Sequence, residues 1–215
     1  MRKKQEKHLE LFVFLILSLA AYLSGSLVWA KIITKFYKKD ITEFGTGNPG
    51  AANFSREFGA KGAIAVFAGD LFTSFSVFTI CIFATTKFSN YGIIHQIIFA
   101  CLILSGTFFP IFFRFKGGTG LAKFLGISCA INPLSFIFMF PFILIIFFKT
   151  RNFALLGTLL VILITLSSSI ANYKYSLFPL EYSYPDMDGL YTLIVCGLLV
   201  FTKGMHQYNG HLFYD

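Results

Sequence analysis

The chain has 215 residues, of which 56% are hydrophobic and 29 are phenylalanine, and its formal net charge is +8. This composition excludes an ordinary soluble domain, because apolar runs long enough to cross a bilayer dominate the chain. The basic residues lie at the ends of these runs, which suits lipid headgroups and argues against nucleic acid as a partner.

The apolar runs predict an all-α, polytopic integral membrane protein with about seven transmembrane helices in one domain, residues 1–215. A basic head, residues 1–10, precedes the first run and is interpreted as the start of a retained helix rather than a cleaved leader. Ser24, Gly25 and Ser26 in this run predict a close approach of a neighbouring helix. The predicted spans are 11–33, 62–85, 93–113, 119–131, 134–148, 153–171 and 189–202.

A polar, glycine-rich loop, residues 45–56, follows the first span. Its three glycines permit positive φ, and such a backbone can turn several N–H groups toward an anion. The side chains of Asn48, Asn53 and Arg56 add donors around it. The loop is therefore predicted to bind phosphate.

The second span carries a carboxylate, Asp70, at a depth where an ionisable group is costly. An intramembrane acid indicates a functional site by default, and a simple structural hydrogen bond is the open alternative. The predicted partner of Asp70 is Arg56 or Lys116.

A second basic, glycine-rich loop, residues 114–120, follows the third span and includes Lys116. It is typical of a loop that leads into a helix N-terminus, where unpaired N–H groups attract anions. It is not a Walker A motif, because the spacing of glycine and lysine differs. A third polar segment, residues 203–211, ends the last span and carries His206 and Asn209.

The four cysteines all lie inside apolar segments and show no CxxC spacing, which argues against a disulfide framework and a zinc site. They are interpreted as small buried hydrophobic residues: Cys81, Cys101, Cys129 and Cys196. The sequence implies no metal and no organic cofactor.

Most of the 18 lysines and arginines fall on one side of the membrane if the two glycine-rich loops share that side. The positive-inside rule then predicts a cytoplasmic C-terminus and an outside N-terminus, although the basic head opposes this orientation. The three polar segments are predicted to lie together on the cytoplasmic face.

The order and spacing of these segments resemble the bacterial acyl-phosphate:glycerol-3-phosphate acyltransferase family of the PlsY type. The first signature is carried by Gly45-Thr46-Gly47-Asn48-x-Gly50-Ala51-x-Asn53-x-x-Arg56-x-x-Gly59. The second is carried by Phe115-Lys116-Gly117-Gly118-x-Gly120, and the remains of a third by His206 and Asn209.

This resemblance implies a seven-helix enzyme of the bacterial plasma membrane, the inner membrane in a two-membrane cell, whose site opens to the cytoplasm. It would transfer an acyl group from acyl phosphate to the 1-hydroxyl of glycerol 3-phosphate, giving lysophosphatidic acid for phospholipid biosynthesis. The implied catalytic residues are Thr46, Asn48, Arg56, Lys116 and His206. The implied phosphate-binding residues are Gly47, Gly50, Asn53, Gly117, Gly118, Gly120 and Asn209.

The chain departs from the family pattern mainly at cationic positions. The family's second loop lysine is Thr119 here, and an upstream family histidine is Thr107. The lysine of its Asp-x-x-Lys-Gly motif is Thr73, and two arginines in the tail are Met205 and Gln207. Each lost charge-assisted hydrogen bond removes roughly 1.5 to 3 kcal/mol of phosphate binding.

Three functions follow from these observations. An acyltransferase is the leading hypothesis, and the alternative is a non-catalytic or substrate-altered membrane paralogue that binds a phosphorylated lipid precursor or a partner acyltransferase. A small transporter or channel would need more intramembrane ionisable residues than Asp70.

Overall fold

The computed structural model describes residues 2–85, 92–133, 137, 141, 162–163 and 188–212. The predicted spans 134–148 and 153–171 lie outside the described residues, apart from isolated positions. Within the described ranges the secondary structure is helical and includes no strand, which confirms the all-α class.

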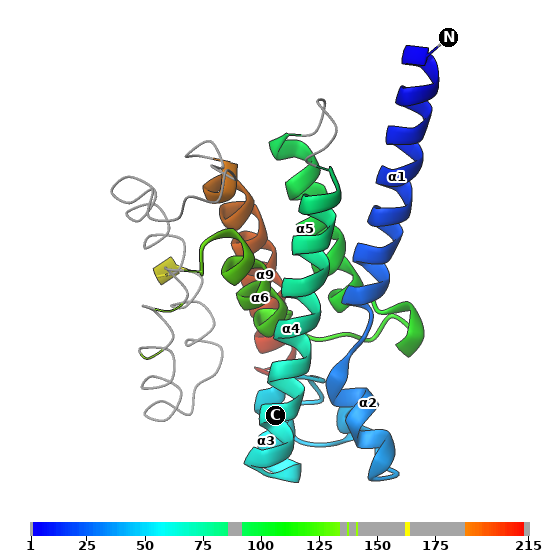
Figure 1. Cartoon of the computed structure of the whole chain (residues 1–215). Helices are drawn as coiled ribbons and strands as arrows, with labels where there is room; N and C mark the ends of the chain where they lie inside the picture. The colour runs from blue at the N-terminus through cyan, green and yellow to red at the C-terminus, as the bar shows by residue number, and fades with distance from the viewer. Residues whose placement is uncertain are drawn as a thin grey trace.

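The long helices α1, α4 and α5 run alternately down and up side by side, and α2 continues below α1 (Figure 1). In chain order the described elements are α1 (Arg2–Gly25), α2 (Trp29–Phe36), the 3-10 turn η1 (Ile41–Glu43), α3 (Ala51–Phe58), α4 (Ala60–Thr85), α5 (Ile93–Phe108), the 3-10 turn η2 (Ile111–Phe113), α6 (Leu121–Ile131) and α9 (Asp188–Leu212).

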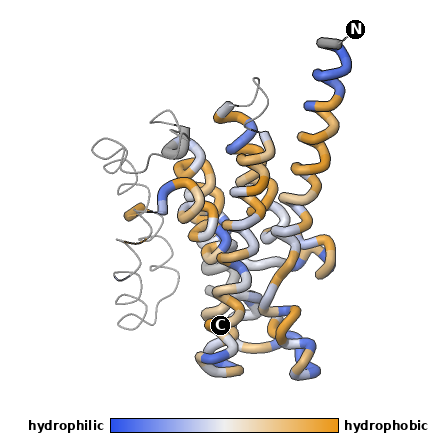
Figure 2. The backbone as a smooth tube through the Cα atoms, viewed as in Figure 1, coloured by the Kyte–Doolittle hydropathy of each residue, from blue (hydrophilic) through white to orange (hydrophobic). Residues whose placement is uncertain are grey.

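Three helical segments of the described part are long and apolar enough to cross a membrane: Lys4–Gly25, Ala60–Thr85 and Ile93–Phe113. Two shorter apolar helices, Leu121–Ile131 and Tyr191–His206, accompany them. Hydrophobic residues cover most of the length of α1, and hydrophilic residues gather toward the ends of the bundle (Figure 2). The chain is therefore a membrane protein built from apolar helices.

The predicted first span, 11–33, is divided between two helices. Helix α1 already includes most of the basic head and ends at Gly25, and α2 starts only at Trp29 after an extended residue, Val28. The apolar pattern continues across this break, so sequence did not indicate it. The break has a tertiary cause, because the Leu27 carbonyl accepts a hydrogen bond of 3.0 Å from the side chain of Lys123 on α6.

Small residues let α1 and α5 pack backbone to backbone, as predicted from Ser24, Gly25 and Ser26. A Cβ atom on Gly106 would lie 2.9 Å from the Ser26 nitrogen, and one on Gly25 would lie 3.1 Å from the Gly106 Cα. The Thr107 hydroxyl donates across the same crossing to the Gly25 carbonyl, at 3.3 Å. This crossing fixes the lower ends of α1 and α5 against each other.

Two hydrophobic clusters organise the described part. The larger includes Phe78, Phe99 and Phe124 and joins α4, α5 and α6 with residues of α1 and α9. The smaller joins α2, η1, α3 and α4 through Ala30, Ile41, Phe54, Ala63 and Val66. The smaller cluster therefore anchors the first glycine-rich loop to the base of α4.

All four cysteines are free thiols, as predicted. Cys81 and Cys196 are buried in the larger cluster, whereas Cys101 and Cys129 are half-buried.

Candidate functional site

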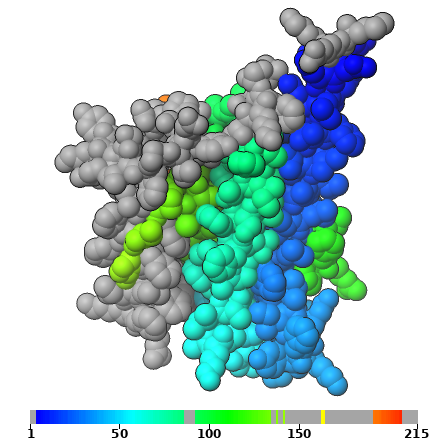
Figure 3. All heavy atoms as spheres, in the orientation of Figure 1, coloured from blue at the N-terminus to red at the C-terminus, as the bar shows by residue number. Residues whose placement is uncertain are grey.

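The two glycine-rich loops and the C-terminal half of α9 lie at the same end of the bundle, opposite the N-terminus of α1 (Figure 1). At this end the Lys203 ammonium of α9 lies 5.1 Å from the ring centre of Phe109, the residue that follows α5. The turn η2 projects from the side of the molecule beside α1 and α2 (Figure 3). The three polar segments therefore share one end of the molecule, as predicted.

Asn53 holds the first glycine-rich loop in shape. Its Oδ1 accepts from the Thr46 backbone N–H at 3.0 Å, and its Nδ2 donates to the carbonyls of Phe44 at 2.8 Å and Ile41 at 3.3 Å. Asn53 is only 2% exposed. Both N–H donors of its carboxamide are thus used on the backbone of the residues that precede the loop.

The loop is shorter than predicted, because α3 begins directly after Gly50 and makes Asn53 and Arg56 helical. Gly45 and Gly47 have φ of 55° and 66°, the left-handed region that glycine adopts most easily. Gly50 caps α3 with an extended backbone and without a side-chain hydrogen bond. The first N–H groups of α3 therefore lack a side-chain cap.

The second glycine-rich loop has an unusual backbone before Lys116. Arg114 and Phe115 both have positive φ, 53° and 60°, a conformation that non-glycine residues adopt rarely and at a cost. The loop ends at Gly120, with φ of 79°, and α6 begins at the next residue without a side-chain cap. The prediction that this loop leads into a helix N-terminus is confirmed.

The two loops meet where Gly118 faces Asn48. A Cβ atom on Gly118 would lie 2.9 Å from Asn48 Oδ1 and 3.6 Å from the Pro49 carbonyl oxygen. Gly117 is equally confined, since a Cβ there would lie 2.7 Å from the Phe108 carbonyl oxygen. Asn48 Oδ1 is buried and has no hydrogen-bond partner. The loop junction, defined as Asn48 and Gly118, thus contains a buried acceptor that lacks a donor.

Three lysines lie around the start of the second glycine-rich loop, next to Phe113. Lys116 is exposed, and its backbone N–H donates to the Phe113 carbonyl at 3.1 Å. From α2, the ammonium groups of Lys31 and Lys35 lie 5.6 Å and 5.5 Å from the ring centre of Phe113. Burial lowers the pKa of Lys31, and nearby Lys116 lowers it further, against the opposing effect of Asp40.

Asp40 precedes η1 and faces the same cations. Its carboxylate accepts from the Thr42 backbone N–H at 3.0 Å and from the Thr42 hydroxyl at 2.8 Å. Partial burial raises the pKa of Asp40, but the hydrogen bonds from Thr42 and the charges of Lys31 and Lys116 outweigh it and lower the pKa overall.

The other predicted site residues lie at the end of the bundle that carries the two glycine-rich loops. Thr46 is half-buried and held through its backbone, Arg56 is exposed on α3, and His206 is exposed on α9, one turn after Lys203. Asn209 also lies in α9. Among the residues that the structure describes, no three His, Cys, Asp or Glu side chains group as a metal site.

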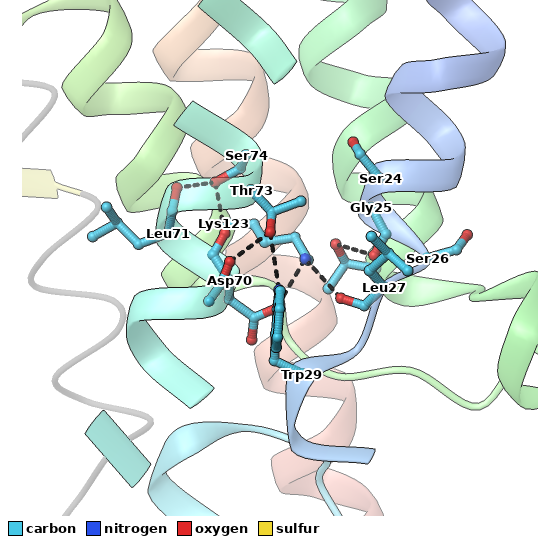
Figure 4. A network of polar contacts seen from close by, with 12 residues as sticks. Ser24, Gly25, Ser26, Leu27, Trp29, Asp70, Leu71, Thr73, Ser74 and Lys123 are labelled. Carbon is cyan, nitrogen blue, oxygen red and sulfur yellow. Dashed lines mark hydrogen bonds and ion pairs between the residues drawn. The ribbon is translucent and has the colours of Figure 1, made fainter. Parts of the chain in front are cut away.

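Asp70 pairs with Lys123, so the predicted partners Arg56 and Lys116 are wrong. The Lys123 ammonium lies 2.8 Å from Asp70 Oδ1, and both side chains are almost fully buried between α4 and α6 (Figure 4). The same ammonium donates to the Leu27 carbonyl. The sequence pattern places basic residues at the ends of apolar runs, but Lys123 lies inside the apolar helix α6, and that position is the sign of its burial.

Trp29 completes this network from the start of α2 (Figure 4). Its indole N–H donates to the Thr73 hydroxyl at 2.9 Å, and its backbone N–H donates to the Asp70 carboxylate. Thr73 in turn donates to the Gly69 carbonyl at 2.6 Å. The network therefore joins α2, α4 and α6, which supports the structural alternative for Asp70.

The comparisons with known proteins agree with this arrangement. The family model described as "Glycerol-3-phosphate acyltransferase" matches residues 15–211. The glycerol-3-phosphate acyltransferase of Enterococcus faecalis is 32% identical over 195 residues, which cover 90% of this chain and 85% of the relative. That of Aquifex aeolicus is 31% identical over 197 residues, which cover 91% and 93%.

Two solved structures have the same fold. The crystal structure of PlsY, an integral membrane glycerol 3-phosphate acyltransferase, in its glycerol 3-phosphate form has a TM-score of 0.75 at 30% identity and covers 93% of this chain and 92% of its own. The lysophosphatidic acid form has a TM-score of 0.73 with the same identity and coverage.

Proposed function

Because the chain belongs to the glycerol-3-phosphate acyltransferase family, we propose that the loop junction is where this membrane acyltransferase of phospholipid synthesis binds glycerol 3-phosphate. The acyl donor is acyl phosphate, and the products are lysophosphatidic acid and inorganic phosphate. The glycerol 3-phosphate and lysophosphatidic acid forms of PlsY support this acceptor and this product.

Two uncapped helix starts support phosphate binding at the junction. Gly50 and Gly120 lead into α3 and α6 without side-chain caps, so backbone N–H groups and the positive ends of both helices are available to an anion. Gly47, Gly117 and Gly118 carry no side chain that would separate the two loops or cover their backbone. Lys116 adds a charged donor. Asn53 contributes by holding the loop rather than by donating to phosphate.

The unpartnered acceptor Asn48 Oδ1 is the observation that carries the proposal. A buried oxygen without a donor costs about 1 to 3 kcal/mol, and a substrate hydroxyl removes that cost. Glycerol 3-phosphate supplies hydroxyl groups next to its phosphate, so the junction suits both halves of the molecule. The hydrogen bond to Asn48 positions the glycerol for attack.

Positioning and charge stabilisation are sufficient for the chemistry with this donor. The 1-hydroxyl oxygen attacks the acyl carbonyl carbon, a new ester C–O bond forms, and the bond from that carbon to the phosphate oxygen breaks. The hydroxyl proton leaves with the phosphate, which is already a good leaving group. Arg56 and Lys116 stabilise the phosphate charge, and Thr46 and His206 contact the reacting groups.

The site opens to the cytoplasm of a bacterial cell whose plasma membrane the chain crosses with seven helices. The distribution of lysine and arginine supports this orientation, because most of those in the described residues lie toward the end of the bundle that carries the loops.

Phosphate release from palmitoyl phosphate and glycerol 3-phosphate by the detergent-purified protein tests the proposal. Lys116→Ala and Arg56→Ala are each expected to lower kcat/KM by about 10-fold to 150-fold, because each removes a charge-assisted hydrogen bond. The matched control is Lys61→Ala, an exposed lysine at the start of α4, which should match the wild type. A wild-type rate equal to the protein-free blank would reject these substrates.

A further inference from the structure

Lys31 is a buried cation beside the second glycine-rich loop. It is only 8% exposed, whereas Lys35, one turn later on α2, is exposed. Both ammonium groups lie over the ring of Phe113, three residues before Lys116 in the chain. The pair therefore offers one buried and one solvated lysine against the same ring.

The charge of Lys31 is not neutralised by an ion pair. Within the described ranges no carboxylate lies within ion-pair distance of its ammonium, and the nearest acidic influence, Asp40, already accepts two hydrogen bonds from Thr42. Burying a charge is unfavourable unless a partner compensates it. The cation–π contact with Phe113 offsets only part of this cost.

A second cation increases the need for an anion. Lys116 lies close enough to Lys31 for their charges to repel, which lowers the pKa of Lys31. Lys116 lies in the loop that leads into the uncapped start of α6, so these two cations and this helix N-terminus together form a region of positive potential. A phosphate dianion between them would turn this repulsion into two attractions.

We propose that Lys31 is a further substrate-phosphate-binding residue, acting with Lys116 at the loop junction. The inference rests on the proposed function and deepens it, because it supplies a cation that the family motifs do not predict. It adds one cation to a site in which five family positions are replaced by Thr119, Thr107, Thr73, Met205 and Gln207.

The test compares Lys31→Met and Lys31→Arg with the matched control Lys35→Met, which removes a charge from the same ring at an exposed position. Lys31→Met should raise the KM of one phosphate substrate by about 10-fold or more, with kcat changed less. Lys31→Arg and Lys35→Met should stay within about threefold of the wild type. A higher KM for glycerol 3-phosphate assigns Lys31 to the acceptor, and a higher KM for palmitoyl phosphate assigns it to the donor.

A binding measurement that does not depend on turnover separates the role of Lys31 from the proposed acyltransferase activity. Calorimetric titration with inorganic phosphate and with glycerol 3-phosphate should show weaker binding to Lys31→Met than to Lys35→Met, even if no turnover is seen. Normal turnover with unchanged KM and unchanged titrations in Lys31→Met would overturn the role of Lys31 alone. Failure of the wild type to bind either phosphate would overturn both proposals.

The pH dependence provides a second readout in case Lys31→Met does not fold. Phosphate binding needs the charged ammonium, so wild-type affinity should fall as the pH rises through a Lys31 pKa that lies below the ordinary value of 10.5. Lys31→Arg stays charged and should keep its affinity over that range. Asp40, Lys35 and Lys116 are present in both proteins, so identical pH profiles would overturn the inference.

Discussion

Asn53 shows how one polar side chain can determine the shape of a binding loop. Its carboxamide makes three hydrogen bonds to the backbone of residues 41–46 while itself almost fully buried. Breaking one of these hydrogen bonds would leave a buried donor or acceptor unpaired, at a cost of about 1 to 3 kcal/mol, so the bonds hold the loop in this shape. The motif suggested a phosphate donor at this position, and the geometry favours a positioning role.

Gly118 provides the sharpest residue-scale prediction. Gly118→Ala would bring a methyl group to 2.9 Å from Asn48 Oδ1, closer than real contacts allow, so Asn48 must move. We expect kcat/KM to fall by about 10-fold or more, in keeping with roughly 1 to 3 kcal/mol for overpacking. The measurement is the phosphate-release assay, with the Tm recorded alongside.

Gly204→Ala is the control for this change. Gly204 lies in α9, and a Cβ there would meet nothing within 4 Å. It should keep wild-type kcat/KM and a Tm at least as high, since alanine favours helix. Wild-type activity in Gly118→Ala would remove the loop junction from the site.

Sequence predicted the glycines of the site well and its charges poorly. Gly45, Gly47 and Gly120 have the positive φ that a glycine-rich pattern indicates. Lys31 and Lys123 follow or interrupt apolar runs, where a lysine normally marks the membrane interface. Their burial depends on which helices pack together, and no local pattern carries that information.

At the scale of elements, the ion pair of Asp70 and Lys123 connects parts that are distant in sequence. Helices α4 and α6 pack closely, and the Lys123 ammonium extends the connection to the linker between α1 and α2. Sequence predicted α4, α5 and α6 because their apolar runs end at polar residues. It missed the break after α1 because that break depends on Lys123, which comes much later in the chain.

Removing one member of this pair should be more harmful than removing both. Lys123→Met leaves the Asp70 carboxylate buried without its cation, and we expect a loss of roughly 3 to 5 kcal/mol in the free energy of unfolding. Asp70→Asn combined with Lys123→Met should recover part of that loss, because no buried charge remains. Thermal unfolding in detergent measures both.

An exposed lysine serves as the reference for these variants. Lys61→Met should leave the Tm unchanged, because exposed charges contribute little. The cycle is completed by Asp70→Asn alone. If the loss of stability in the double variant equals the sum of the losses in Lys123→Met and Asp70→Asn, the two residues are not energetically coupled.

At the scale of the whole molecule, polar and apolar residues are segregated along the bundle axis. Large apolar residues are exposed on α1, α4 and α5, for example Phe12, Ile80 and Ile94, and hydrophobic residues follow much of these helices (Figure 2). Lysines lie close to phenylalanine rings on α2, in the segment after it and on α9. This pairing of cations and aromatic rings is typical of a membrane–water interface. The loop-bearing end therefore lies where a soluble phosphate and a membrane-held acyl chain can meet.

The orientation of the bundle can be measured directly in bacterial cells. A fluorescent protein fused after residue 215 should fluoresce, and alkaline phosphatase fused there should be inactive, because a cytoplasmic C-terminus prevents export. An accessible epitope at the N-terminus should be detected from the outside. Active C-terminal alkaline phosphatase would reverse the proposed orientation and place the loops outside.

The pairing of Asp70 with Lys123 also sets an order for biogenesis. At synthesis rates of about 5 to 20 residues per second, Asp70 leaves the ribosome roughly 3 to 10 s before Lys123. During that interval the carboxylate of Asp70 has no ammonium partner, and a lone acid is poorly tolerated by lipid. Helix α4 is therefore expected to stay beside the insertion machinery until α6 arrives, so that the two helices enter the bilayer as a pair.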